Sequence, residues 1–181
     1  MTTRGECGAR LKWGALCVLC LLATACAWPL EREPPVPRAR VEELARNWLR
    51  AWESGDRELL RSTLHPQMLF AYPSVRADAA RTLASFDEFH RDFTDTRVYL
   101  HQIQVDGNRF TVEYQFATTR RSNNKRQAVG TVALGEVRDD RIVLVKEYVD
   151  GRVSRMQEAG QLPLAEGEEP FPWPRQESAA P

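Results

Sequence analysis

The stretch DGNRFTVEYQF, residues 106–116, carries the strongest fold signal in the chain. Asp106-Gly107 is typical of a tight hairpin turn. From Phe110 to Phe116, large apolar side chains alternate with polar ones. Alternation with a period of two indicates a strand that is buried on one face only. The stretch therefore predicts the turn of a hairpin and the strand that follows it.

Further strand-like segments flank this hairpin. Residues 97–105 precede it, and residues 127–137 and 142–149 follow it. Asn123-Asn124 and Asp139-Asp140 stand between these segments as turn residues. The second half of the mature chain is therefore predicted to be a meander of four antiparallel strands.

The residues before the meander follow the period of a helix. In residues 41–54, Val41, Leu44, Trp48 and Trp52 form one apolar stripe. Gly55 is predicted to end this helix, and a short helix runs from there to residue 64 with Asp56 as its cap. A strand at 67–72 and a third helix at 77–93 follow. Helices that precede a meander indicate an α+β domain, not an α/β one.

Composition excludes several classes of protein. The 181 residues suit one domain, and 25 basic residues balance 25 acidic ones, so we expect no nucleic-acid partner. No cysteine follows Cys26, which excludes a disulfide scaffold or a cysteine nucleophile in the mature domain. The three histidines are scattered and no phosphate-binding or dinucleotide motif is present, so we expect neither a metal nor a cofactor.

Residues 1–25 are predicted to be a signal peptide. Three basic residues precede Trp13–Ala25, an uncharged run that is too short to span a bilayer of about 30 Å. LATAC, residues 22–26, resembles the bacterial lipobox, which implies a lipid on Cys26 and a lipoprotein of the cell envelope. Ala27 mildly favours the outer membrane, because it is not the aspartate that retains enteric lipoproteins in the inner membrane. Ordinary cleavage after Ala25 is the alternative.

Two flanking segments look unlike a folded core. Residues 26–40 are rich in proline and are predicted to form a tether between the membrane and the domain. Residues 158–181 are rich in proline and glutamate and are predicted to be a mostly disordered tail, whose Phe171 and Trp173 could return to cover a pocket. The folded domain is then expected to span residues 41–157.

Residues 41–152 resemble the nuclear transport factor 2-like superfamily, and within it the SnoaL-like domains. The resemblance lies in four segments: WESGD at 52–56, LHP at 64–66, the hairpin at 106–116, and RIVLVKEYVD at 141–150. It implies a cone-shaped α+β barrel, in which three N-terminal helices pack on a curved, mainly antiparallel sheet. Such domains include isomerases, cyclases, dehydratases, epoxide hydrolases and binding modules, so the fold leaves the function open.

The resemblance also implies an apolar pocket between the helices and the sheet. Enzymes of the family use an aspartate or histidine base there, with a tyrosine or a second acid. His101, in mid-strand, is the candidate base, with Tyr114, Glu147 or Tyr72 as its partner. Glu147 and Tyr148 alternate, so the pocket can hardly receive both. The predicted pocket wall is Trp48, Trp52, Phe70, Tyr72, Phe86, Phe89, Phe116 and Tyr148, although such aromatic residues more often simply fill a core.

Two functions remain open at this point. The favoured one is a non-catalytic module that binds a small apolar molecule or serves an envelope partner, because no acid–base pair is evident. The alternative is a cofactor-free isomerase, cyclase or dehydratase, which would be favoured if His101 met a tyrosine or carboxyl group in a cavity. The last strand is apolar on both faces in its centre, which suggests that a homodimer covers the outer face of the sheet.

Overall fold

The computed structural model describes residues 35–161. The predicted signal peptide, the lipidation site at Cys26, residues 26–34 of the predicted tether and residues 162–181 of the predicted tail lie outside this range. Within residues 35–161, no helix has the length and hydropathy that a membrane crossing requires.

Four helices lie in the described part of the chain, and short-range signals fix their ends. They are α2 (Arg38–Ser54), α3 (Arg57–Thr63), α4 (Ala79–Asp92) and α5 (Gly151–Glu158). Gly55 ends α2 in the left-handed region, with φ of 73°, and the Asp56 side chain accepts the Leu59 N–H at the start of α3. Both predicted helix boundaries are therefore confirmed. Helix α5 was not predicted.

One six-stranded sheet contains all the strands of this range. They are β1 (Leu64–Tyr72), β2 (Val75–Ala77), β3 (Phe93–Asp106), β4 (Arg109–Arg120), β5 (Lys125–Arg138) and β6 (Arg141–Asp150), in the order β2-β1-β6-β5-β4-β3. The pairing of β1 with β6 is parallel, and each of the other neighbouring pairs is antiparallel. The predicted meander is thus β3 to β6, and β1 and β2 extend it beyond β6.

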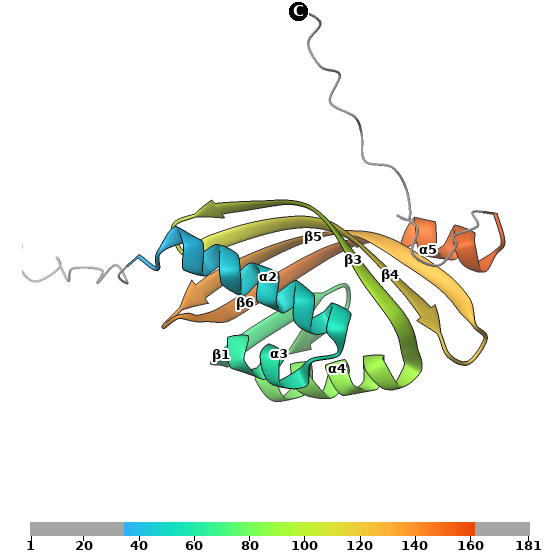
Figure 1. Cartoon of the computed structure of the whole chain (residues 1–181), viewed down its shortest axis with the longest axis horizontal. Helices are drawn as coiled ribbons and strands as arrows, with labels where there is room; N and C mark the ends of the chain where they lie inside the picture. Colours follow the sequence, from blue (N-terminus) through green and yellow to red (C-terminus); the bar gives the residue numbers. More distant parts are fainter. Residues whose placement is uncertain (1–34, 162–181) are drawn as a thin grey trace, which may run out of the picture. The chain divides into compact units, whose positions relative to one another are not determined.

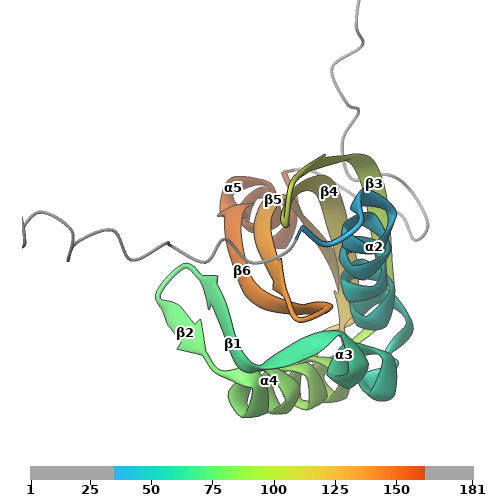
Figure 2. The ribbon, with the colours of Figure 1, turned by 90° about the vertical axis from the view of Figure 1, so that its left-hand side faces the viewer.

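The sheet is strongly curved, and α2, α3 and α4 lie on its concave side (Figure 1). In the view along the barrel, the strands wind from β1 through β6 and β5 to β3, with α2 beside β3 and α4 beside β1 (Figure 2). The predicted cone-shaped α+β fold, with three helices on a mainly antiparallel sheet, is confirmed.

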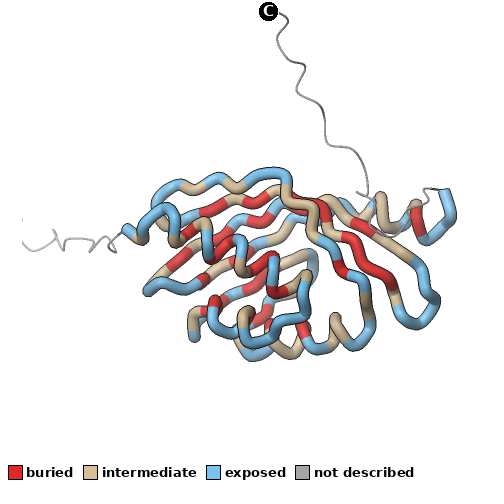
Figure 3. Tube along the Cα trace, in the orientation of Figure 1, coloured by how far each residue is buried: buried red, intermediate tan, exposed pale blue. Residues whose placement is uncertain are grey.

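The core fills the space between α2 and the sheet. Val41, Leu44 and Trp48 of α2 are at most 1% exposed and belong to one hydrophobic cluster with Phe110 and Val145 of the sheet. Buried positions run along the middle of the strands, whereas the hairpin tips are exposed (Figure 3). This apolar packing leaves an open cavity on the inner side of the sheet.

Candidate functional site

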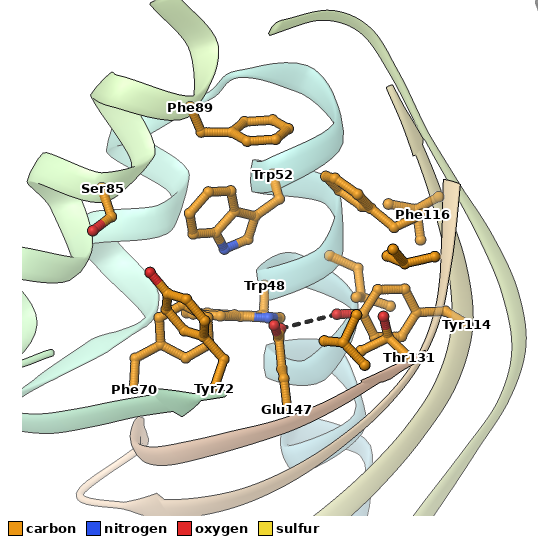
Figure 4. Close-up of a pocket in the computed structure, with 14 residues that line it drawn as sticks. Trp48, Trp52, Phe70, Tyr72, Ser85, Phe89, Tyr114, Phe116, Thr131 and Glu147 are labelled. Atoms are coloured by element: carbon orange, nitrogen blue, oxygen red, sulfur yellow. Dashed lines mark hydrogen bonds between the residues drawn. The ribbon is translucent and has the colours of Figure 1, made fainter. Parts of the chain in front are cut away.

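The cavity has a volume of about 250 Å³ and lies between the helices and the sheet. Its walls come from α2, α4 and five of the strands, and are largely aromatic and aliphatic (Figure 4). The lining residues are Trp48, Leu49, Trp52, Phe70, Tyr72, Ser85, Phe89, Val98, Tyr114, Phe116, Val129, Thr131, Glu147 and Val149. An apolar cavity with a few converging polar groups is the usual form of a small-molecule site.

A carboxylic acid and a phenol meet on the sheet side of this cavity. The Tyr114 hydroxyl on β4 donates to Oε1 of Glu147 on β6 at 2.9 Å (Figure 4). The Trp48 side chain on α2 forms a second hydrogen bond to the Glu147 carboxylate, and Thr131 on β5 forms one to Tyr114. Glu147 is the one acidic residue in the cavity wall, and its charge is met only by neutral donors.

The surroundings of Glu147 shift its titration toward neutral pH. Burial raises the pKa of Glu147 from 4.5 to about 7, and the hydrogen bonds from Tyr114 and Trp48 only partly oppose this. Burial, followed by the nearby Glu147 charge, raises the pKa of Tyr114 well above 10. Tyr114 therefore stays a proton donor in a hydrogen bond, whereas Glu147 can gain or lose a proton near pH 7. An acid with that pKa suits general acid–base catalysis.

The structure places most of the predicted site residues on the cavity wall. Tyr114 and Glu147 meet there, and Trp48, Trp52, Phe70, Tyr72, Phe89 and Phe116 line it. Two of the predicted wall residues lie elsewhere. Phe86 is 2% exposed and belongs to the core, and Tyr148 is 62% exposed because its strand turns Glu147 inward. These two placements correct the predicted pocket wall.

The prediction that His101 is a base in the pocket is wrong. His101 is exposed on the outside of the sheet, where its Nδ1 lies 2.9 Å from Oε2 of Glu113. The reason is a shift of register in the β3–β4 ladder between Leu100 and Gln102. Such a bulge adds one residue and reverses the alternation. As a result, Leu100 and Ile103 pack against the core on either side of the bulge, and His101 faces away from it.

Two polar residues of the wall were missed by the sequence analysis. Thr131 lies directly opposite Tyr114 in the β4–β5 pairing, and Ser85 projects from α4. The register that places Thr131 follows from the turn between Arg120 and Lys125, which are themselves paired. The turn signal at Asn123-Asn124 therefore contained the information that was needed to find Thr131. No comparable signal marks Ser85.

The described residues contain no group of three or more His, Cys, Asp or Glu side chains that could hold a metal ion.

Comparison with known proteins relates this fold to several solved structures, and no curated protein matches the chain. An LEH-like epoxide hydrolase from M. tuberculosis has a TM-score of 0.63 and 19% identity, over 70% of this chain and 95% of that one. TsrD from Streptomyces laurentii has a TM-score of 0.61 and 20% identity, over 70% and 99%. IdmH from Streptomyces antibioticus, a proposed polyketide cyclase, has a TM-score of 0.59 and 18% identity, over 66% and 98%.

Identities this low establish a shared fold and not a shared activity. The family described as the SnoaL-like domain matches residues 45–145, which is more than half of the 181 residues. These residues contain α3, α4, β1 to β5 and most of α2, and so include most of the cavity wall. The chain therefore belongs to the SnoaL-like domain family.

Proposed function

We propose that the domain binds a small, largely apolar carbonyl compound and moves a proton on it through Glu147, as a cofactor-free isomerase, cyclase or dehydratase. The observation that carries this proposal is the Glu147 carboxylate, which accepts the Tyr114 hydroxyl at 2.9 Å inside an aromatic cavity. The solved structures of similar fold include an epoxide hydrolase and a proposed cyclase, which supports the cavity as a place for chemistry.

The proposed step needs no oxidant or reductant. The ionised Glu147 takes a proton from the carbon next to the carbonyl group, and the electron pair of the broken C–H bond moves toward the carbonyl oxygen. In an isomerase, Glu147 then returns the proton to the same carbon or to a conjugated one. In a cyclase, the carbanion attacks a second carbonyl carbon of the ligand and the resulting alkoxide takes the proton, whereas in a dehydratase a hydroxyl group next to the carbanion leaves with the proton as water. A pKa of about 7 keeps Glu147 partly ionised at neutral pH and makes both directions of transfer accessible.

The cavity volume limits the size of the ligand. A dry cavity of about 150 Å³ holds benzene, so by proportion a cavity of about 250 Å³ suits about ten non-hydrogen atoms. The aromatic walls favour a ring or a branched apolar group over a flexible polar chain. Acetophenone is a suitable probe, because it has this size and carries both a carbonyl group and an acidic methyl group.

Exchange of the acetophenone methyl protons for deuterium in D₂O tests this function. We expect the purified protein to accelerate the exchange, as measured by proton NMR, and Glu147→Gln to lower the acceleration by at least about 100-fold. Glu113→Gln is the matched control, because Glu113 lies on the outside of the sheet with His101 and Gln102. An unchanged rate in Glu147→Gln would refute the role of Glu147.

A second candidate, a binding module without chemistry, is favoured by one observation. The nearest donors to Glu147, Tyr114 and Trp48, already bond to its carboxylate and hold it in place. Saturable binding of acetophenone with no faster exchange in any variant would support this candidate over the enzyme.

We also propose that a second copy of the chain covers the outer face of the sheet. Leu69, Leu134 and Tyr148 lie on β1, β5 and β6 and are 40%, 40% and 62% exposed, and Val132, paired with Tyr148, is 36% exposed. We expect native mass spectrometry to give twice the monomer mass, and Leu134→Lys to give the monomer, because a lysine would be buried without a partner. A monomeric wild-type protein at micromolar concentration would contradict this proposal.

Export remains a proposal that is supported by residues 1–26 alone. In this proposal, the mature protein begins at a lipid-modified Cys26 in the bacterial envelope. Mass spectrometry of the N-terminal peptide distinguishes this from cleavage after Ala25 without lipid.

A further inference from the structure

The cavity lies toward one end of the barrel, and the C-terminal segment leaves the domain at that same end. Glu147 and Val149, in the second half of β6, line the cavity, whereas Ile142 in the first half is fully buried in the core. Helix α5 begins at Gly151, close behind Val149, and lies beside the β4–β5 hairpin (Figure 1). The described chain ends at Gln161, just beyond α5. The segment that follows therefore starts at the cavity end of the barrel.

Two side-chain hydrogen bonds hold α5 at this end of the sheet. Strand β5 extends beyond its pairing with β6, which stops at Gly130. The Gln157 side chain of α5 accepts the Ala128 N–H at 2.7 Å, at the position that a longer β6 would occupy. Lys125, at the start of β5, donates to the backbone carbonyl of Glu158 at 3.1 Å. The start of the C-terminal segment is therefore fixed beside the turn between β4 and β5.

This turn carries a cluster of positive charge, which we call the basic tip. It consists of Arg120, Arg121, Lys125 and Arg126. Within residues 35–161, the charged groups of the basic tip contact backbone carbonyl oxygens or an aromatic ring, and none forms an ion pair with an acidic side chain. Arg121 and Lys125 are exposed. The basic tip therefore attracts a negatively charged segment.

The chain itself supplies an acidic and aromatic segment within reach of the basic tip. Residues 166–169 read EGEE, and residues 170–174 read PFPWP. At about 3.3 Å per extended residue, Glu168 reaches about 23 Å from Gln161, and Trp173 reaches about 40 Å. The prolines beside the aromatic residues restrict the backbone, which lowers the entropy that is lost on binding. The acidic residues come first along the chain and the aromatic ones after them.

The cavity has the size of one aromatic side chain of this segment. Its volume of about 250 Å³ suits about ten non-hydrogen atoms, which is the size of a tryptophan side chain. Val129 of the cavity wall lies on the same strand as Lys125, about 13 Å away at about 3.3 Å per residue. The rings of Trp52, Phe89 and Phe116 line the cavity and offer edge-to-face contacts. A chain that crosses the basic tip therefore comes close to an aromatic cavity.

We propose that residues 166–173 of the same chain bind across the basic tip, and that Trp173 enters the cavity and competes with the ligand. The acidic residues of the segment pair with the basic tip. This inference rests on the ligand site of the proposed function but does not depend on proton transfer by Glu147. Because the segment is tethered, its effective concentration is on the order of millimolar, so a weak contact is enough to hold it. The segment is thus an internal inhibitor that a ligand of higher affinity displaces.

¹⁹F NMR of the full chain labelled with 5-fluorotryptophan detects this contact without any added ligand. The Trp173 signal is identified by its loss in Trp173→Phe. We expect its chemical shift to be the same in H₂O and D₂O, because the cavity shields the fluorine from solvent. Val129→Phe, which fills the cavity, should make the Trp173 signal sensitive to the solvent. A Trp173 signal that is already exposed in the wild type, or that stays shielded in Val129→Phe, would overturn the proposal.

Charge reversal tests the role of the basic tip with the same readout. Glu168→Lys combined with Glu169→Lys should expose the Trp173 fluorine. Arg121→Glu combined with Lys125→Glu should do the same, and all four changes together should shield it again, because opposite charges then face each other. Glu58→Lys is the matched control, since it makes the same charge change on α3. Without an effect of the reversal at Glu168 and Glu169, the basic tip would serve another anionic partner and the proposal would be refuted.

Competition with acetophenone separates this proposal from the proposed function. We expect Trp173→Ala to bind acetophenone about tenfold more tightly than the wild type, as measured by titration calorimetry, because the tethered competitor is lost. Equal affinities would refute the competition. Absence of acetophenone binding in both proteins, together with a shielded Trp173 signal that Val129→Phe exposes, would support the internal segment and refute the proposed function.

Discussion

Glu147→Gln should stabilise the domain by about 3 kcal/mol above pH 7, while it removes the proposed proton transfer. The pKa of Glu147 is raised from 4.5 to about 7 in the folded state, chiefly by burial. Between these two values the folded state holds more protons than the unfolded state, so the free energy of unfolding falls as the pH rises. Each unit of pKa shift corresponds to about 1.4 kcal/mol. Glutamine retains the acceptor oxygen but carries no charge.

Thermal unfolding from pH 4 to pH 9 measures this effect. We expect the two proteins to be similar near pH 4 and the variant to unfold roughly 10 °C higher at pH 8, given a domain of this size. His90 is half-buried, and its lowered pKa makes the free energy of unfolding rise with pH below the usual value of 6.5, which is the opposite direction. That slope is present in both proteins, so it cancels in their difference at each pH.

Glu113→Gln is again the matched control for this experiment. Hydrogen bonds from Gln102 and His101 lower the pKa of Glu113. Its ionised form therefore contributes stability above the usual pKa of 4.5, and this contribution is lost as the pH falls through the lowered value. The control should bring no gain in stability at pH 8. Coincident pH profiles for wild type and Glu147→Gln would contradict the burial of Glu147.

The strands could be predicted because their signal is local. Alternation at Phe110, Val112, Tyr114 and Phe116 marks both the strand and its buried face, and the structure buries Phe110, Val112 and Tyr114. The helix boundaries could be predicted equally well, because the positive φ of Gly55 and the cap at Asp56 depend on neighbouring residues. The fold class followed from these elements in order.

The site was harder to predict from the sequence, because it depends on how strands that are distant in the sequence are aligned. The orientation of His101 was predicted wrongly because of a bulge that no nearby residue type indicates. One extra residue in a strand is enough to move the following side chains to the other face of the sheet. Tyr114 and Glu147 are 33 residues apart and meet only through the registers of β4 with β5 and of β5 with β6. The sequence could say that Glu147 or Tyr148 enters the pocket, but the choice between them required the structure.

Gly135→Ala is expected to destabilise the domain by about 3 kcal/mol or more. Gly135 on β5 is paired with Phe110 on β4, and the Phe110 ring lies over the glycine. A Cβ atom at position 135 would lie 2.0 Å from the Phe110 Cζ and 2.2 Å from its Cε1. The ring is only 2% exposed and is surrounded by the core, so it has little room to move. Overpacking of this kind typically costs about 1–3 kcal/mol, and more where the backbone must shift.

Denaturant unfolding of four proteins measures this contact: wild type, Gly135→Ala, Phe110→Ala and the double variant. Phe110→Ala alone should cost about 3–5 kcal/mol, because it leaves a cavity in the core. In that background the added methyl group meets no ring, so Gly135→Ala should then cost little, and the two losses should not add.

Gly107→Ala is a useful comparison, since Gly107 has φ of 55° in a turn and a Cβ there would meet nothing within 4 Å. Gly107→Ala should lower the free energy of unfolding by only about 1 kcal/mol, through backbone strain. If Gly135→Ala were as mild as Gly107→Ala, or if its loss added fully to that of Phe110→Ala, the Phe110 ring would not be what requires a glycine at position 135.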